Sequence, residues 1–261
     1  MANIIAISNE KGGVAKTTTT LSLGAAFAEL QHRVLLIDLD PQANLTLALG
    51  LEPNKVGKTS ADVLLNGAPL LEARLQTNIP NVDLVPANAG LEQAEQVLPV
   101  YIDFHSRLRT AIESLQAQPY SILLIDCPPS LGAITINALT AANLLVIPTQ
   151  AEYFSAYALR DMMNVIRKVR NEDNPNLAYR ILVTLLDQRN RTHRDIRDQL
   201  EKTFGTGLFK TVIEIDTKLR ESPILGLPIN LYKPNSRGSL QYRSLAEELI
   251  LYVQQTNSEK A

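Results

Sequence analysis

A short segment near the N-terminus limits the possible folds of this chain more than any other feature. An apolar run at residues 4–7 leads into Lys11-Gly12-Gly13-Val14-Ala15-Lys16-Thr17-Thr18, and the residues that follow favour a helix. Gly12 and Gly13 let the backbone turn around an anion at dihedral angles that other residues resist. Consecutive amides and the start of the helix then point at that anion, and Lys16 can neutralise its charge. A strand, a glycine-rich turn and a helix in this order predict a loop that binds the phosphates of a nucleotide.

The rest of the chain alternates between short apolar runs and longer segments with a helical pattern. The apolar runs are residues 4–7, 34–37, 82–85, 122–125, 144–147, 181–185 and 209–212. The helical segments are residues 17–30, 103–117, 156–169, 194–204 and 240–254, with a loop and a short helix in 53–68. Continuous apolar runs are typical of strands that are covered on both faces. The sequence therefore predicts an α/β P-loop NTPase fold, in which helices cover both faces of a doubly wound, mostly parallel sheet.

Length and composition fit one domain in a reducing compartment. The chain has 261 residues, of which 45% are hydrophobic, and we expect one P-loop ATPase domain over residues 1–255 and a polar tail over 256–261. The single cysteine, Cys127, excludes an intrachain disulfide and a cysteine-cluster metal site. No basic segment opens the chain as in a secretory signal, and no apolar run approaches the ~20 residues that span a bilayer. We therefore expect a cytoplasmic protein.

Carboxylates end two of the predicted strands, on the side where the phosphates should lie. Asp38 and Asp40 follow the run at 34–37, and both should share one face because side chains alternate along a strand. Asp126 ends the run at 122–125, which is the Walker B arrangement for holding Mg²⁺ directly or through water. The alternative interpretations are a turn-forming aspartate before Pro41 and a strand that merely ends in aspartate. The coincidence with the phosphate loop favours a hydrolysis site, with Cys127 as a small buried hydrophobic neighbour.

The loop departs from the usual phosphate-loop pattern, G-x-x-x-x-G-K-[ST], at both outer glycines. Glu10 and Ala15 occupy those positions, and an additional lysine, Lys11, lies five residues before Lys16. With DPQAN at 40–44, DCPP at 126–129 and IPTQAEY at 147–153, nearly the whole chain resembles the ParA/MinD class of ATPases with the deviant Walker A motif. Glycine is usual in that family at position 15. Alanine tolerates the required backbone there if φ stays negative.

The resemblance implies a dimer in which two subunits enclose two ATP molecules. Lys11 would reach across the interface to the partner's phosphates, and Asp40 would position the attacking water. The implied catalytic residues are Lys11, Lys16 and Asp40. The implied ATP-binding residues are Lys11, Gly12, Gly13, Val14, Ala15, Lys16, Thr17 and Thr18, with Glu214 and Asp216 at the adenine, where the family more often has Pro and Asn. The implied Mg²⁺ residues are Thr17, Asp38 and Asp126.

The resemblance also implies that the dimer binds double-stranded DNA without sequence preference. A ParB-like partner or cargo adaptor would then stimulate weak hydrolysis, so that DNA or a protein cargo is segregated or positioned on the nucleoid. The net charge is −2, so a DNA-binding surface must be local. The candidate residues are Arg189, Arg191, Lys218, Arg220 and Arg243, and Lys218 lies where relatives often have a DNA-contacting arginine. A solvated charged face is the alternative, because acidic residues lie among these basic ones.

Three other functions occur in related folds. A MinD-like membrane-cycling ATPase needs a basic amphipathic C-terminal helix, whereas residues 244–254 contain Glu247 and Glu248. A nitrogenase-reductase-like electron carrier needs cluster-ligating cysteines that this chain lacks. An ATP-dependent metabolic ligase needs a pocket for a small substrate, and no residue of the sequence excludes it. The match along the chain and the late basic residues favour the positioning ATPase.

Overall fold

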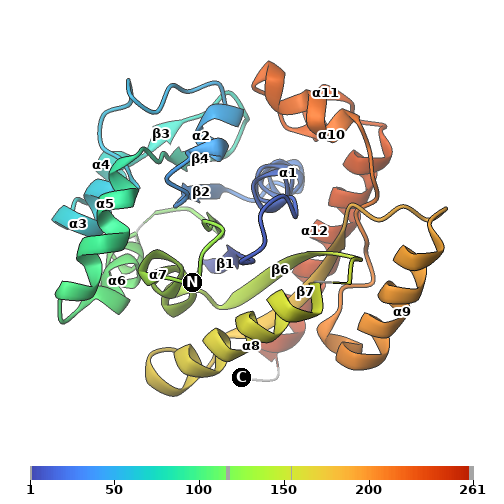
Figure 1. Ribbon diagram of the computed structural model, residues 1–261. Coiled ribbons are helices and arrows are strands. Elements are labelled where there is room, and N and C mark those ends of the chain that lie inside the picture. The colour runs from blue at the N-terminus through green and yellow to red at the C-terminus, as the bar shows by residue number, and fades with distance from the viewer. Residues whose placement is uncertain (1, 116–117, 154, 259–261) are drawn as a thin grey trace.

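The computed structural model describes residues 2–115, 118–153 and 155–258, which are built around one seven-stranded sheet (Figure 1). The strands are β1 (Asn3–Ile7), β2 (Val34–Asp38), β3 (Leu75–Gln76), β4 (Val82–Val85), β5 (Ile122–Asp126), β6 (Leu144–Gln150) and β7 (Ala178–Thr184). Their order across the sheet is β3-β4-β2-β5-β1-β6-β7. All neighbours are parallel except β3 and β4. The predicted doubly wound, mostly parallel sheet is confirmed.

Helices lie on both faces of this sheet. The longer ones are α1 (Lys16–Glu29), α5 (Gly90–Val97), α6 (Arg107–Glu113), α7 (Ala133–Ala141), α8 (Ser155–Glu172), α9 (Arg191–Phe204) and α12 (Arg237–Ser258). Shorter ones are α2 (Asn44–Ala48), α3 (Ser60–Asn66), α4 (Leu70–Ala73), α10 (Lys218–Glu221) and α11 (Ile229–Tyr232), with 3₁₀ turns η1 (Leu98–Val100), η2 (Phe104–Ser106), η3 (Gly205–Gly207) and η4 (Ser222–Leu225). In Figure 1, α3, α5, α6 and α7 gather on one side of the molecule and α10, α11 and α12 on the other.

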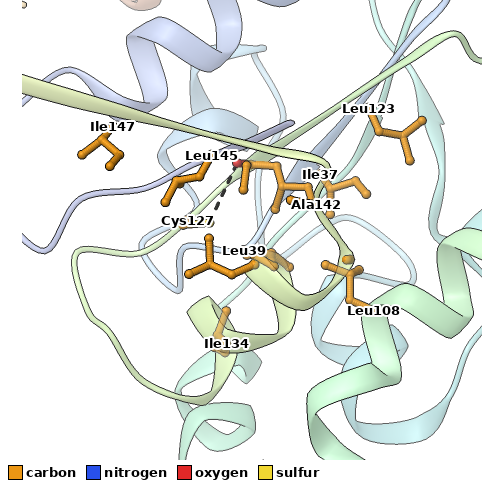
Figure 2. Close-up of a cluster of buried hydrophobic side chains, with 14 of the residues drawn as sticks. Ile37, Leu39, Leu108, Leu123, Cys127, Ile134, Ala142, Leu145 and Ile147 are labelled. Carbon is orange, nitrogen blue, oxygen red and sulfur yellow. Dashed lines mark hydrogen bonds between the residues drawn. The ribbon is translucent and has the colours of Figure 1, made fainter. Parts of the chain in front are cut away.

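Two apolar cores result, one on each face of the sheet. Along β2, Leu35 and Ile37 join the core beneath α5 to α8, whereas Val34 and Leu36 join the core beneath α1 and α12. This division follows from the alternation of side chains along a strand. Figure 2 shows part of the first core, in which Cys127 is buried among apolar side chains and its thiol contacts the carbonyl of Ile125 at 3.9 Å. Cys127 is therefore the buried hydrophobic residue that the sequence predicts.

Strand register collects the polar residues at one edge of the sheet. In the pairing of β1 with β5, Ile7 lies beside Asp126, and in that of β2 with β5, Asp38 lies beside Asp126. The start of the phosphate loop and both acids therefore meet at the carboxyl ends of three adjacent strands. Ligands bind at this edge in open α/β sheets.

The predicted strand at residues 209–212 is wrong. The segment joins the sheet's edge through isolated bridges, Ile181 with Leu208 and Leu186 with Glu214, and not through a continuous ladder. The amides of Phe209 and Ile213 donate to carbonyls of β7, each at 2.9 Å. The amides of Lys210 and Thr211 donate instead to the two carboxylate oxygens of Glu248, at 2.8 and 3.0 Å. A side chain therefore satisfies these two donors and interrupts the ladder.

Other boundaries also differ from the prediction. The helix expected at 103–117 starts with the 3₁₀ turn η2 and continues as α6 to Glu113; the predicted end at Ala117 lies outside the described residues. The helices α5 and α7 were not predicted, and α7 is buried along nearly its whole length, so its sequence has no amphipathic period. The last helix, α12, runs on to Ser258, three residues into the segment that the sequence assigns to a polar tail. None of the described helices is both long and apolar enough to cross a membrane.

Candidate nucleotide-binding site

The segment from Ser8 to Ala15 forms the loop between β1 and α1. Gly13 has φ +74°, a backbone conformation that side chains disfavour, so conformation favours glycine there. Neighbouring strands fix the loop's carbonyls: the Gln150 amide donates to the carbonyl of Gly13 at 3.1 Å, and the Thr184 hydroxyl donates to that of Val14 at 3.0 Å. Because these bonds hold the carbonyls against β6 and β7, the amides on the loop's other side are free to face an anion.

Ala15 is the first residue where the structure corrects the sequence analysis. The expectation was a negative φ, but Ala15 has φ +67° and ψ 35°, in the left-handed region. It is the residue that precedes the first turn of α1. A methyl group in this conformation costs on the order of 1 kcal/mol relative to glycine. The loop therefore keeps the backbone that a glycine would adopt and carries the strain of an alanine.

Lys16 crosses the loop from the first turn of α1. Its ammonium group donates to the carbonyls of Asn9 at 3.0 Å and Lys11 at 3.1 Å, and the residue is buried. Burial lowers the pKa of Lys16, while the nearby charge of Asp126 opposes that shift. Asn9 was missed by the sequence analysis because it belongs to no motif. Its amide donates to the carbonyl of Pro148 at 2.7 Å and its oxygen accepts from the Lys11 amide at 3.0 Å, so it braces the loop.

Asp126 is buried at the end of β5, and one of its carboxylate oxygens lacks a hydrogen-bond partner among the described residues. Its Oδ1 accepts from the Thr20 hydroxyl at 3.1 Å, whereas Oδ2 is buried and has no hydrogen-bond partner in the described part of the chain. Burial, and then the charge of Asp38, raise the pKa of Asp126 to about 8, and the nearby hydroxyls of Thr17 and Thr20 oppose the shift. A buried oxygen of this kind suits a cation as its partner.

These groups fit Mg²⁺ of the kind held at phosphate loops. Within the described ranges no cluster of three His, Cys, Asp or Glu side chains is arranged for a metal. Mg²⁺ does not need such a cluster, because it keeps several waters and binds through one or two protein ligands together with substrate phosphates. The unpartnered oxygen of Asp126 and the adjacent Thr17 hydroxyl would supply those ligands.

Asp38 and Asp40 differ in their surroundings. Both oxygens of Asp38 are used within the chain, since Oδ1 accepts from the Asp40 amide at 3.1 Å and Oδ2 accepts from the amide and hydroxyl of Thr46 at 2.9 and 2.7 Å. Burial raises the pKa of Asp38 to about 7 against these bonds. Asp38 thus anchors α2 and the turn that carries Asp40. Asp40 Oδ1 accepts from the Gln42 amide at 2.9 Å.

A cavity of about 410 Å³ brings most of the predicted phosphate residues together. Its lining from the predicted set is Gly12, Gly13, Ala15, Lys16, Thr17, Thr18 and Asp40. Gln42, Asn44, Pro129 and Pro223 also line it and were missed. The first three lie in the DPQAN and DCPP motifs, so those motifs were the available signal. Pro223 had none, because tertiary packing brings η4 to the cavity from far along the chain.

Lys11, the additional lysine of the loop, lies beside this cavity and is paired within its own chain. Its ammonium group forms an ion pair with Glu152, which follows β6, at 2.5 Å. The Lys11 side chain is 28% exposed and that of Glu152 is 49% exposed. An exposed pair of this kind is weakly held, typically by less than about 1 kcal/mol. Lys11 therefore lies at the surface next to the phosphate cavity, and its ion pair with Glu152 can easily be replaced by another partner.

This site has relatives along nearly the full chain. The profile of a protein family described as an AAA domain matches residues 2–179. The sporulation initiation inhibitor protein Soj of Bacillus subtilis is 42% identical over 250 residues, which cover 95% of this chain and 98% of Soj. The chromosome partitioning protein ParA of Caulobacter vibrioides is 39% identical over 249 residues, which cover 95% of this chain and 93% of that protein. The chain belongs to the ParA/MinD family of P-loop ATPases.

Solved structures agree with this family and its fold. The chain is similar to the crystal structure of cobyrinic acid a,c-diamide synthase from Mycobacterium smegmatis with bound ADP and magnesium, with a TM-score of 0.85 and 33% identity. The match covers 97% of this chain and 96% of that one. The P-loop fold predicted from the sequence is thereby confirmed.

The two residues that the ParA/MinD resemblance assigns to adenine have other partners in this family member. Asp216 accepts from the Lys218 amide at 2.9 Å and the Gly238 amide at 3.0 Å, so it joins the starts of α10 and α12. Glu214 forms an ion pair with Arg237 at 2.9 Å. Neither residue lines the phosphate cavity. The Asp216 carboxylate thus holds the backbone at the starts of α10 and α12, and the Glu214 carboxylate binds the Arg237 side chain.

The basic residues proposed for DNA are mostly paired with acids. Arg189 lies 3.1 Å from Asp187, Arg191 lies 3.6 Å from Asp195, and Lys218 lies 2.7 Å from Glu221. Arg220 is exposed and has no ion pair within the residues that the structure describes. These four side chains are at the surface, where exposed pairs exchange readily.

Arg243 differs from the other four. It binds both oxygens of Glu29 in α1, at 2.7 and 2.9 Å, and also the carbonyl of Pro234. The hydrogen bond from Arg243 lowers the pKa of Glu29. A bidentate pair between α1 and α12 joins two helices, so Arg243 has a structural role in the fold. Its contact with DNA stays a prediction.

Proposed function

We propose that this chain is a ParA-type ATPase that forms an ATP-dependent dimer, binds DNA without sequence preference and positions DNA or a protein cargo. The observation that carries the proposal is the pair of lysines at one phosphate loop. Lys16 is buried on the loop's inner side, whereas Lys11 is partly exposed beside the cavity. This difference supports a role of Lys16 at the chain's own nucleotide and of Lys11 at a neighbour's.

Within one subunit, the loop amides and Lys16 would bind the phosphates of ATP, and Thr17 and Asp126 would hold Mg²⁺. Bound Mg²⁺ neutralises charge that develops on the phosphates during hydrolysis. Asp40 lines the same cavity and carries one oxygen, Oδ2, that is not used by the Gln42 amide. That carboxylate is suited to orient the attacking water. Asp38 supports it indirectly, by accepting from the Asp40 amide.

Dimerisation would exchange the partner of Lys11. In the single chain Lys11 is paired with Glu152, and in the dimer it would move to the phosphates held by the other subunit. A cation that arrives from a partner stabilises the transition-state charge in the manner of an arginine finger. ATP and ADP forms would then differ in dimer affinity, because only ATP offers the γ-phosphate that Lys11 binds.

DNA binding would use the exposed basic residues Lys218 and Arg220 of α10, with Arg189 and Arg191 at the start of α9. Each forms at most a weak surface pair, which DNA phosphates can displace. A ParB-like or cargo-bound protein would stimulate hydrolysis and release the dimer from DNA. This scheme places the protein in the cytoplasm, associated with the nucleoid.

An amide-forming ligase is the second candidate, favoured by the similarity to the cobyrinic acid a,c-diamide synthase structure. A ligase would couple ATP to a small acid and would have no need of DNA. One experiment separates the two functions: the mobility of an arbitrary duplex DNA is measured with the protein and Mg²⁺, with ATP, with ADP and without nucleotide. A shift with ATP alone supports the proposal. No shift under any condition, with ATP turnover that requires a small carboxylic acid, would establish the ligase.

A further inference from the structure

The start of α7 is held by a side chain from another helix. Gly132 precedes the helix and has no side chain with which to cap it. The carboxylate of Glu95, on α5, accepts instead from the amides of Ala133 at 2.8 Å and Ile134 at 3.0 Å. These are two of the donors that the first turn of a helix leaves unpaired. The cap of α7 is thus the side chain of Glu95, which lies 38 residues before Ala133 in the chain.

Gly132 completes this contact by leaving room for it. A methyl group placed on Gly132 would lie 1.5 Å from Glu95 Oε1 and 2.7 Å from its carboxyl carbon. The φ angle of Gly132 is −87°, which any residue adopts, so space and not conformation requires glycine here. Glu95 and Gly132 are therefore two parts of one interaction.

The segment that this interaction anchors carries part of the nucleotide site. Residues 127–132 join Asp126, at the end of β5, to α7, and Pro129 in this segment lines the phosphate cavity. The sheet fixes the segment's first residue, since the Cys127 amide donates to the carbonyl of Ile7 at 3.1 Å. Its other end is fixed through the first turn of α7, which Glu95 holds.

We propose that Glu95 is a positioning residue for ATP hydrolysis: by capping α7 it fixes residues 127–132 and with them the wall of the cavity next to Asp126. This role rests on the ATPase activity proposed above. Lys16 and the loop amides belong to α1 and the loop before it, whereas the hydrogen bonds described for Glu95 go to the start of α7. Loss of Glu95 should therefore slow turnover more than it weakens nucleotide binding.

The test compares Glu95→Ala with Arg107→Ala. Arg107, on α6, donates to the carbonyls of Leu64 at 2.8 Å and Leu65 at 3.0 Å, so it joins helices on the same face without touching the start of α7. Both variants should lower the melting temperature by about 2–4 °C, as expected for a lost cap or equivalent bond. Only Glu95→Ala should lower kcat, by roughly three- to tenfold, with the Kd for ATP changed by less than about twofold.

Gly132→Ala tests the same contact from its other side. In the wild-type background the added methyl displaces the Glu95 carboxylate, so kcat should fall to the level of Glu95→Ala. Adding Gly132→Ala to Glu95→Ala should cause no further loss, because nothing is left to displace. Glu95→Gln, which keeps one acceptor oxygen, should recover part of kcat.

Two outcomes would overturn the inference while leaving the proposed function intact. One is a Glu95→Ala variant whose kcat equals that of Arg107→Ala. The other is a double variant whose loss of kcat equals the combined losses of Glu95→Ala and Gly132→Ala. If the wild-type protein itself turns over no ATP, the proposed function and the role of Glu95 both fail.

Discussion

The charged groups at the carboxyl ends of the strands and the basic residues of the C-terminal half are held in different ways. Lys16, Asp38 and Asp126 are buried, and backbone or hydroxyl groups of neighbouring elements bind them. Arg189 and Arg191 are about nine-tenths exposed, and each pairs with an acid two or four residues away. The first group has one arrangement, fixed before any ligand binds, whereas the second exchanges partners easily. Preorganised charge suits catalysis, and exchangeable charge suits non-specific binding to phosphates.

The largest expected effect tests the preorganised region. Asp40→Ala should lower ATP hydrolysis by roughly 100-fold or more, in the range measured for catalytic groups that orient or accept protons from a nucleophile. ATP binding should remain, so the variant should accumulate as a long-lived ATP dimer that still shifts DNA. Turnover of ATP and sedimentation in ATP measure the two properties.

Asp40→Asn is the matched control for this change. It keeps the oxygen that accepts from the Gln42 amide at 2.9 Å, so the local turn should survive, while the charge is lost. Equal loss of turnover in both variants supports a role of the carboxylate charge. If Asp40→Ala instead abolishes dimerisation and DNA binding as completely as removal of Lys16 does, the assignment of Asp40 to the water is wrong.

The second prediction compares the two lysines of the loop. Lys16→Ala should lower the affinity of a single subunit for ATP by roughly 10- to 100-fold, because charge-assisted hydrogen bonds to phosphate are lost. Lys11→Ala should leave that affinity within about twofold and remove ATP-dependent dimerisation. Calorimetric titration of ATP at low protein concentration, together with sedimentation, separates the effects. Equal loss of ATP affinity in both variants would contradict an intersubunit role for Lys11.

The two regions also differ in how far the sequence predicts them. Asp38, Asp126 and the loop were found because each follows an apolar strand, and parallel register brings strand ends together. Partners of surface charges follow from packing instead: Arg243 meets Glu29, 214 residues away, and no local pattern indicates it. The same holds for Glu95, which accepts two hydrogen bonds from the start of α7, a helix that the periodicity did not predict. The left-handed backbone of Ala15 was missed because its own side chain gives no sign of it.

The third prediction concerns the exchangeable charges. Reversing both Lys218 and Arg220 to glutamate should weaken DNA binding by the ATP-bound protein and reduce the slope of log affinity against log salt by roughly 2, about 0.9 for each phosphate contact. ATP-driven dimerisation should be unchanged, because neither residue lines the phosphate cavity. Unchanged DNA affinity at fixed salt would show that this surface is not the DNA-binding one.

Arg243→Ala is the control, and it should act on stability. Loss of its pair with Glu29 should cost about 1–2 kcal/mol at pH 7, after allowance for its partial exposure. The bond lowers the pKa of Glu29 below its ordinary value of 4.5, so this stability is present above that pH and is lost as the pH falls through the lowered pKa. Urea unfolding of wild type and variant should therefore differ at pH 7 and converge in acid. If Arg243→Ala lowers DNA affinity without lowering stability, Arg243 belongs to the DNA-binding surface.

The smallest effect is expected where the preorganised region carries strain. Ala15→Gly removes the backbone strain of a left-handed alanine, which is on the order of 1 kcal/mol. Glycine also raises the conformational entropy of the unfolded chain, and this lowers the free energy of unfolding by about 0.4–1 kcal/mol. The net change should be a gain of at most about 1 kcal/mol in the free energy of unfolding, with ATP affinity unchanged because the backbone already has the glycine-like φ of +67°. Ala28→Gly, within α1, lacks this strain and should instead lose about 1 kcal/mol. Urea unfolding measures both, and a loss at Ala15 as large as that at Ala28 would show that no strain is stored in the loop.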